Sequence, residues 1–282
     1  MRSLRALPRT IARNVRLVFT DIDDTLTSDG LLEASAFAAM WSLFENGVGV
    51  VPVTGRPAGW CDHFARMWPV AGVIGENGAF YFRYDRQARR LIRRFVLDEA
   101  ERRTLQQRLR SVRDRILADV PGAAVASDQD YRIHDLAIDY CEDVPPLSDE
   151  DVERIVTGFG KAGATAKVSS IHVNGWFGRY DKLGMIQIFA REVAALDLQD
   201  PKGRTRAIFI GDSPNDEPGF AFFDRTSVGV ANVRRFVDQL QHAPAFVTRA
   251  RGGQGFAELA RALLRSRRSP VRRPRRATPK AP

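Results

Sequence analysis

The chain has 282 residues, of which 44% are hydrophobic, and it carries a formal net charge of +9. This length and composition exclude a protein that is disordered throughout, because they allow a sizeable core in one large domain or two modest ones. No run of eighteen apolar residues occurs, and the first sixteen residues lack the apolar stretch of a secretory signal. We expect no membrane insertion and a cytoplasmic location, which suits two cysteines that are too few for a disulfide framework.

The positive charge lies at the two ends of the chain. Residues 1–16 contain five arginines and no acid, and residues 265–282 contain seven arginines, one lysine and no acid. Because the ends hold thirteen positive charges and the whole chain carries +9, residues 17–264 carry a net charge of −4. We expect a basic N-terminal extension at residues 1–14 and a disordered basic tail at residues 265–282. Nucleic acid is expected as a partner only through this tail.

Strands and helices are expected to alternate over the first part of the chain. Apolar runs predict strands at 15–20, 48–53 and 73–75, and helical periodicity predicts helices at 35–45 and 57–67. These lengths are typical of right-handed βαβ units, which build a parallel sheet.

The pattern changes near residue 80. The expected elements are a hairpin formed by 79–84 and 91–97, helices at 99–118 and 149–160, and strands at 131–140 and 164–173. Antiparallel strands beside helices are typical of an α+β unit, so we expect an inserted cap domain at residues 80–181.

The alternation returns at Lys182. The expected elements are a helix at 182–195, a strand at 207–210, a helix after 215, a strand at 227–230 and a helix at 255–264. The predicted fold class is therefore α/β, with a Rossmann-like parallel-sheet core formed by residues 15–79 and 182–264 and an inserted α+β cap.

Polar side chains follow the expected strands of the core. They are Asp21 and Asp23 after the first strand, Thr54 after the second, Asp212 and Asp216 after the strand at 207–210, and Lys182 at the start of the returning helix. Ligands of parallel sheets bind outside the carboxyl ends of the strands, so these side chains should meet at one edge. Carboxylates that lie close together repel each other unless a cation or a substrate separates them. The gathering of hard oxygen ligands predicts a Mg²⁺ site.

Four motifs in order resemble those of the haloacid dehalogenase superfamily of phosphotransferases. DIDDTLT at 21–27 resembles the first motif, VTGR at 53–56 the second, the lysine of YDK at 180–182 the third, and GDSPND at 211–216 the fourth. The insertion between the second and third motifs resembles the type 2 cap of subfamily IIB. That subfamily contains the Cof-type, sucrose-phosphate and mannosyl-3-phosphoglycerate phosphatases and the eukaryotic-type phosphomannomutases. GENGA at 75–79 is similar to the start of the cap in that group.

The resemblance implies phosphatase chemistry through an aspartyl-phosphate. It implies that Asp21 is the nucleophile and that Asp23 is the general acid and then the general base. It also implies that Thr54 and Lys182 stabilise the phosphoryl group. The implied ligands of Mg²⁺ are Asp21, Asp23 through its backbone carbonyl, Asp212 and Asp216.

Further residues are expected to contact the substrate. They are Gly55, Arg56, Asn77, His172, Asn174, Arg179 and Asn215. Arg56 is open to two interpretations, in which it neutralises phosphate or pairs with an acid, and Asn215 either contacts the site or only shapes its turn. Alternation along IHVNGW puts His172 and Asn174 on one strand face, where they line the cleft or face solvent.

The expected function is a Mg²⁺-dependent phosphatase acting on a small phosphorylated metabolite, a sugar phosphate or a phosphorylated glycoside. One alternative is a phosphohexomutase of the phosphomannomutase type, which keeps the same covalent chemistry but excludes water from the intermediate. An alternative of another class is a nucleic-acid-binding protein that acts through the basic tail.

Overall fold

A six-stranded sheet forms the centre of the computed structural model, which describes residues 1–169 and 171–267. Its strands lie in the order β1 (Arg2–Ser3), β15 (Phe246–Val247), β14 (Ser227–Gly229), β13 (Ala207–Gly211), β2 (Leu17–Thr20) and β5 (Gly49–Pro52). All five neighbouring pairs are parallel. The central strands β2 and β13 are buried along their whole length, which explains their unbroken apolar sequence.

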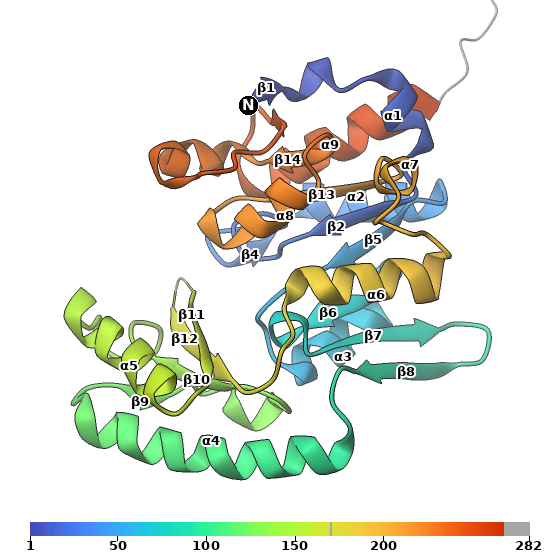
Figure 1. Cartoon of the computed structure of the whole chain (residues 1–282). Coiled ribbons are helices and arrows are strands. Elements are labelled where there is room, and N and C mark those ends of the chain that lie inside the picture. Colours follow the sequence, from blue (N-terminus) through green and yellow to red (C-terminus); the bar gives the residue numbers. More distant parts are fainter. Residues whose placement is uncertain (170, 268–282) are drawn as a thin grey trace, which may run out of the picture.

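Helices cover both faces of this sheet, so the core has three layers (Figure 1). One face packs against α2 (Ala34–Glu45), α3 (Ala58–Met67) and α9 (Gly252–Arg267). The other packs against α6 (Lys182–Ala194) and α8 (Glu217–Phe222). The shorter elements of the core are α7 (Pro201–Arg204), the hairpin β3 (Thr27–Ser28) and β4 (Leu31–Leu32), and the 3-10 helices η1 (Leu4–Ala6), η2 (Glu76–Gly78), η4 (Pro214–Asp216) and η5 (Ala231–Gln239). The predicted α/β fold class with a parallel core sheet is confirmed.

The N-terminal segment belongs to the core, so the predicted extension at residues 1–14 is wrong. Strand β1 joins the edge of the sheet, where Arg2 is opposite Phe246, and α1 (Arg9–Asn14) packs on α9. Leu4 and Ala12 are buried in the core, whereas the arginines between them are exposed. The apolar residues interspersed among the arginines therefore give this segment one buried side.

The hairpin that follows β6 (Val73–Gly75) also belongs to the core rather than to the cap. Strands β7 (Phe80–Asp85) and β8 (Arg90–Phe95) extend β6 into a three-stranded antiparallel sheet. A parallel bridge from Val53 to Ile74 connects this sheet to β5. Phe80 and Phe82 are fully buried in the core cluster, so the boundary predicted at residue 80 lies too early.

We use the name cap for residues 99–177, which have an apolar cluster of their own. Its sheet has the order β11 (Thr165–Val168), β12 (His172–Trp176), β10 (Leu136–Asp139) and β9 (Ala124–Val125), with the 3-10 helix η3 (Gln129–Tyr131) before β10. Helices α4 (Glu99–Asp119) and α5 (Asp149–Lys161) lie on the face away from the core (Figure 1). The opposite face of the cap sheet is therefore directed towards the core.

Two predicted cap strands and one predicted terminus differ from the structure. Only 136–139 of the strand expected at 131–140 is extended, because 129–131 forms a 3-10 turn. The segment expected to form one strand at 164–173 instead contains β11 and the start of β12, and these two strands pair in an antiparallel hairpin. Helix α9 continues to Arg267, so the disordered tail does not begin at 265, and residues 268–282 lie outside the described residues. No helix within the described residues has the length and apolar character needed to cross a membrane.

Candidate active site

Three aspartates meet at the carboxyl ends of β2 and β13. One carboxylate oxygen from each of Asp21, Asp212 and Asp216 lies within 4.8 Å of the others. The turn after β13 holds Asp216 in place, because its Oδ2 accepts the backbone N–H of Asp212 at 2.9 Å and of Ser213 at 3.3 Å. Its Oδ1 is buried and has no hydrogen-bond partner among the residues that the structure describes. The parallel pairing of β2 with β13 thus brings together acids that are almost two hundred residues apart.

Lys182 reaches this cluster from the first residue of α6. Its Nζ donates to Asp21 Oδ1 at 2.8 Å, and both side chains are largely buried. A cation is disfavoured at the N-terminus of a helix by the helix dipole, so Asp21 compensates the cost of placing Lys182 there. Asp181 caps the same helix by accepting the backbone N–H of Gly184 at 2.6 Å.

Burial and mutual repulsion shape the protonation of the acids. Burial raises the pKa of Asp21 to about 7 against the opposing effect of Lys182, and neighbouring Asp216 and Asp23 raise it further. Burial, with Asp216 and Asp21, raises the pKa of Asp212 to about 8. A cation placed among these carboxylates would lower both pKa values, because it favours the ionised forms.

Asp23 stands apart from this cluster. Its Oδ1 accepts from Arg56 Nη2 at 2.7 Å and Nε at 3.3 Å, and its side chain is 41% exposed. The Asp23 side chain is thus paired with Arg56 and lies outside the cluster of three carboxylates, in keeping with the expectation that Asp23 would offer only its backbone carbonyl to the metal. The same ion pair decides between the two interpretations of Arg56 in favour of pairing with an acid. Asp23 Oδ2 is not used by this pair.

Thr54, Gly55 and two amides form the opposite wall. Thr54 is buried, and its Oγ1 accepts the backbone N–H of Arg56 at 3.1 Å. A Cβ atom on Gly55 would lie 3.2 to 3.3 Å from the side-chain amides of Asn77 and Asn174. Both amides are 95% buried, and neither makes a side-chain hydrogen bond to any described residue. Gly55 therefore leaves room for two amides that retain their full hydrogen-bonding capacity.

These groups line a cleft of about 540 Å³ between the core and the cap, a size that suits a small molecule. It is lined by every expected site residue except Asp216 and Arg179, which are absent from its wall. Asp216 instead lines an adjoining cavity of about 210 Å³. Arg179 is exposed beyond the end of β12 and does not line this cleft, and its expected role in substrate binding stays a prediction.

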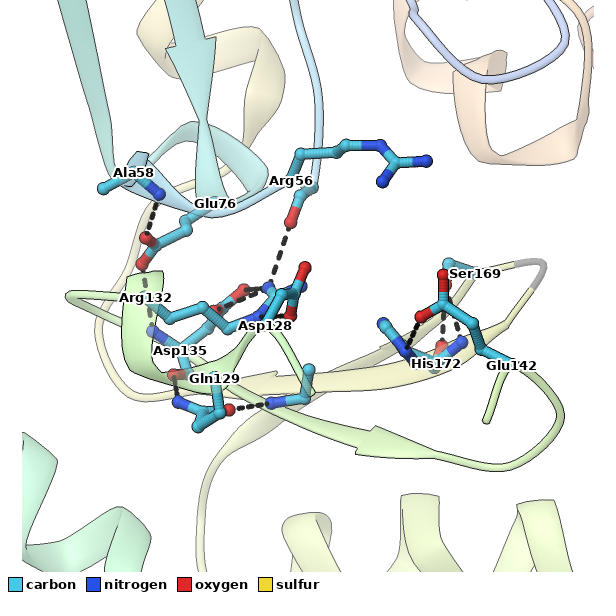
Figure 2. A network of polar contacts seen from close by, with 12 residues as sticks. Arg56, Ala58, Glu76, Asp128, Gln129, Arg132, Asp135, Glu142, Ser169 and His172 are labelled. Atoms are coloured by element: carbon cyan, nitrogen blue, oxygen red, sulfur yellow. Dashed lines mark hydrogen bonds and ion pairs between the residues drawn. The ribbon is translucent and has the colours of Figure 1, made fainter. Parts of the chain in front are cut away.

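His172 and Asn174 face the cleft rather than solvent. His172 is 4% exposed, and its Nε2 lies 2.8 Å from Glu142 Oε2 (Figure 2). Asn215 also does more than shape a turn, because its Nδ2 donates to the carbonyl oxygen of Val168 in the cap at 3.1 Å.

Sequence reasoning missed Lys167, which reaches the cleft from the cap strand β11. Its Nζ donates to the backbone carbonyl of Asn215 at 2.9 Å, and it lines both cavities beside Lys182. Burial and the proximity of Lys182 lower the pKa of Lys167 to about 8. The alternation Thr165, Lys167, Ser169 would have placed it on the cleft face if the segment had been interpreted as a hairpin.

Sequence reasoning also missed a buried network that joins the cap to the core (Figure 2). The Glu76 carboxylate in the core accepts backbone N–H groups of Ala58 and of Ile133, His134 and Asp135 in the cap, at 2.6 to 3.3 Å. Arg132 donates to the Gly55 carbonyl at 3.1 Å and pairs with Asp128 and Asp135. These contacts therefore hold the cap against the core along one edge of the cleft.

The family model of haloacid dehalogenase-like hydrolases matches residues 18–114. This match agrees with the resemblance seen in the motifs, and it makes residues 18–114 similar to haloacid dehalogenase-like hydrolases. None of the curated proteins matches the sequence.

Solved structures show that the likeness covers the core and the cap together. Thermoplasma acidophilum 0175 is 18% identical, with a TM-score of 0.67 over 89% of this chain and 98% of its own. A haloacid dehalogenase-like hydrolase from Bacteroides thetaiotaomicron is 16% identical, with a TM-score of 0.61 over 88% and 98%. The sucrose-phosphatase of Synechocystis sp. PCC6803, solved in complex with sucrose and phosphate, is 14% identical, with a TM-score of 0.60 over 89% and 98%. These identities define a shared fold.

Proposed function

We propose that the protein is a Mg²⁺-dependent phosphatase that hydrolyses a small phosphorylated metabolite, a sugar phosphate or a phosphorylated glycoside. The observation that carries the proposal is the convergence of carboxylate oxygens of Asp21, Asp212 and Asp216 within 4.8 Å, with Lys182 Nζ 2.8 Å from Asp21. Asp21, Asp212 and Lys182 line the cleft, and Asp216 lines the adjoining cavity. The family match supports hydrolytic chemistry, and the resemblance of the fold to a sucrose-phosphatase supports a sugar phosphate.

The residues present fit a magnesium ion. Asp21, Asp212 and Asp216 offer hard oxygen ligands, and the buried Oδ1 of Asp216 has no other partner among the described residues. The raised pKa values of Asp21 and Asp212 indicate a site in which negative charge is not compensated by the protein alone. Bound Mg²⁺ would supply positive charge that stabilises the phosphoryl oxygens during transfer.

Asp21 would act as the nucleophile in a two-step displacement. In the first step an Asp21 carboxylate oxygen forms a bond to phosphorus, and the bond from phosphorus to the leaving oxygen breaks. Protonated Asp23 gives its proton to that oxygen, so the alcohol leaves in neutral form. In the second step Asp23 takes a proton from water, whose oxygen bonds to phosphorus as the aspartyl-phosphate bond breaks. Inorganic phosphate leaves, and both aspartates return to their starting states.

The positions of the neighbouring side chains suit these roles. Arg56 contacts only Oδ1 of Asp23, which leaves Oδ2 free to carry the proton. The Thr54 hydroxyl and the Lys182 ammonium line the same cleft and would stabilise negative charge on the phosphoryl oxygens. Lys182 also fixes the carboxylate of Asp21 through its 2.8 Å hydrogen bond.

The substrate's organic part would lie against the cap wall. Asn77 and Asn174 present amide groups without hydrogen-bond partners among the described side chains, and His172 lies beside them on the cleft face. Amides offer both donors and acceptors, which matches the hydroxyl groups of a sugar. Gly55 provides the space in which the two amides approach each other.

The test is phosphate release from a panel of phosphorylated sugars, glycosides, nucleotides and amino acids, with Mg²⁺ or with EDTA. We expect Mg²⁺-dependent release by the native protein, and we expect Asp21→Asn to lower the rate by about a thousandfold or more, because the nucleophile is lost. Asp24→Asn is the matched control, since Asp24 lines the cleft outside the acid cluster and has a φ of 54° that Asn tolerates.

Two outcomes would contradict the proposal. Equal release by the native protein and by Asp21→Asn would exclude Asp21 as the nucleophile. Interconversion of hexose 1- and 6-phosphates without phosphate release would replace hydrolysis by a mutase reaction.

A further inference from the structure

Lys167 brings a cation from the cap into the cleft, where Lys182 and the acid Asp21 also lie. It lies on β11 opposite Asn174 of β12, so the two side chains share one face of the cap sheet. From there its ammonium group reaches the turn that carries Asp216, where it donates to the Asn215 carbonyl at 2.9 Å. Lys167 also lines both the main cleft and the smaller adjoining cavity, as Lys182 does.

The ammonium group of Lys167 has no anionic partner in the described part of the chain. One of its three N–H groups is used by the Asn215 carbonyl, and it forms no ion pair with a described acid. The neighbouring cation is Lys182, which is already paired with Asp21, and its effect on Lys167 outweighs each of those of Asp216, Asp21 and Asp181, none of which forms an ion pair with Lys167. A largely desolvated ammonium beside another ammonium is unfavourable unless an anion lies against it.

A second contact fixes this arrangement. Asn215 Nδ2 donates to the Val168 carbonyl oxygen at 3.1 Å, while the Asn215 carbonyl accepts from Lys167. These two hydrogen bonds hold the hairpin β11–β12 of the cap against the turn at 214–216 of the core. The position of Lys167 relative to Asp216 is therefore set by contacts between the cap and the core.

We propose that Lys167 is a catalytic residue contributed by the cap, which binds an oxygen of the phosphoryl group that is transferred. This proposal rests on the proposed phosphatase function and adds a cation that none of the four motifs contains. The phosphoryl group carries negative charge, and the two remaining N–H groups of Lys167 are suited to its oxygens. The phosphate site is then complete only when β11 lies against the core turn, so that cap position and phosphate affinity are coupled.

The experiment compares Lys167→Met and Lys167→Arg in the full chain with Mg²⁺ present. Two quantities are measured: kcat/KM for p-nitrophenyl phosphate, which has no second anionic group, and the dissociation constant of inorganic phosphate by titration calorimetry. We expect Lys167→Met to weaken phosphate binding and to lower kcat/KM by about tenfold or more each, because a charge-assisted hydrogen bond is lost. Lys167→Arg should retain most of both, since it keeps the charge.

Lys161→Met is the matched control, because Lys161 is an exposed lysine at the end of α5 in the same cap. It should change neither quantity. Circular dichroism and thermal unfolding of each variant exclude misfolding as the cause of a loss.

The outcomes separate this inference from the proposed function. If Lys167→Met binds phosphate and turns over p-nitrophenyl phosphate as the native protein does, the inference is wrong, while the phosphatase function stands. If the native protein binds phosphate without hydrolysing any ester, and Lys167→Met loses that binding, the role of Lys167 stands and the phosphatase function fails. If Lys167→Met changes KM only for substrates with a second anionic group, Lys167 binds the leaving group and the inference is overturned.

Discussion

At the scale of single residues, His134 is a histidine buried among aromatic rings at the seam between the core and the cap. It is 5% exposed, and its ring lies 5.9 Å from that of Phe80, 5.5 Å from that of Phe95 and 6.3 Å from that of Tyr180. Neither ring nitrogen has a hydrogen-bond partner among the described residues. Burial, together with the charge of Arg102, lowers the pKa of His134 from 6.5 to about 3, although its Nδ1 lies 3.8 Å from Glu76 Oε2.

This histidine makes stability depend on pH. Between pH 6.5 and pH 3 the unfolded chain binds a proton at His134 that the folded protein does not bind, so the contribution of His134 to the free energy of unfolding falls as the pH falls through this range. At about pH 5.5 the loss from this one residue should be about 1.4 kcal/mol. Urea unfolding near pH 7.5 and 5.5 measures the effect, and His134→Phe should remove this share of the decrease.

The comparison variant is His63→Phe at an exposed histidine on α3. It should leave the pH dependence of the native protein unchanged. An equal decrease in the native protein and in His134→Phe would show that His134 is not the residue responsible.

At the scale of elements, the contacts at the start of helix α6 fix both the first turn of the helix and the position of Lys182. Asp181 accepts the N–H of Gly184, and the next residue is Lys182. Gly78 passes so close to this point that a Cβ atom there would lie 2.0 Å from the Asp181 carbonyl oxygen, and its φ is +101°. The start of α6 is therefore held by a capping carboxylate and by direct contact with the backbone of η2.

Replacing the cap residue of α6 tests this element. Asp181→Ala should lower the free energy of unfolding by about 1 kcal/mol, because the N–H of Gly184 loses its partner. Asp181→Asn should lose much less, since Asn is also a favourable capping residue. Thermal or urea unfolding of the two variants gives the comparison, and an equal loss in both would attribute the effect to charge rather than to capping.

At the scale of the whole molecule, the Glu76 carboxylate joins the cap to the core. Both of its oxygens accept backbone N–H groups, from Ala58 in the core and from residues 133–135 in the cap. Figure 2 shows the contacts to Ala58 and Asp135. Burial and Asp135 raise the pKa of Glu76 to about 8 against the opposing effect of these backbone donors and of Arg132. The donors favour carboxylate oxygens over an amide, whose N–H groups would face them. Glu76 also has a φ of 42°, which is uncommon for a residue with a side chain.

The variant Glu76→Gln should weaken this junction. Its amide nitrogen would face N–H donors, so we expect a loss of about 2 kcal/mol or more in stability and faster hydrogen exchange at residues 132–135. Hydrogen exchange read by mass spectrometry locates the change. Glu153→Gln, at an exposed position on α5, serves as the control. Unchanged exchange at 132–135 in Glu76→Gln would mean that this carboxylate does not hold the cap.

Features that depend on short stretches of sequence were predictable. The buried strand β2 and the acids that follow it lie within a few neighbouring residues, and the same holds for β13 and the turn at 212–216. Because parallel strands end at one edge of a sheet, these local patterns also predicted that Asp21, Asp212 and Lys182 would meet.

Features that depend on register and on distant contacts were not predictable in the same way. Lys167 lines the cleft because β11 pairs with β12 as a hairpin, and the register of this pairing sets which side chains face the core. Arg56 forms an ion pair with Asp23, which lies 33 positions away in the chain, so local sequence could not show this contact. The N-terminal arginine-rich segment became part of the core because β15 and α9 offered it an edge and an apolar surface.

The sequence by itself determined the α/β class, the inserted cap and the gathering of acids, because buried strands and the positions where they end follow from short local patterns of apolar and polar residues. The tertiary structure alone decided where the cap begins, which cap side chain reaches the turn that carries Asp216 and how Glu76 and Arg132 join the cap to the core. The physical reason is that these contacts join segments far apart in the chain, and their energies depend on distances that are defined only once the sheets have formed.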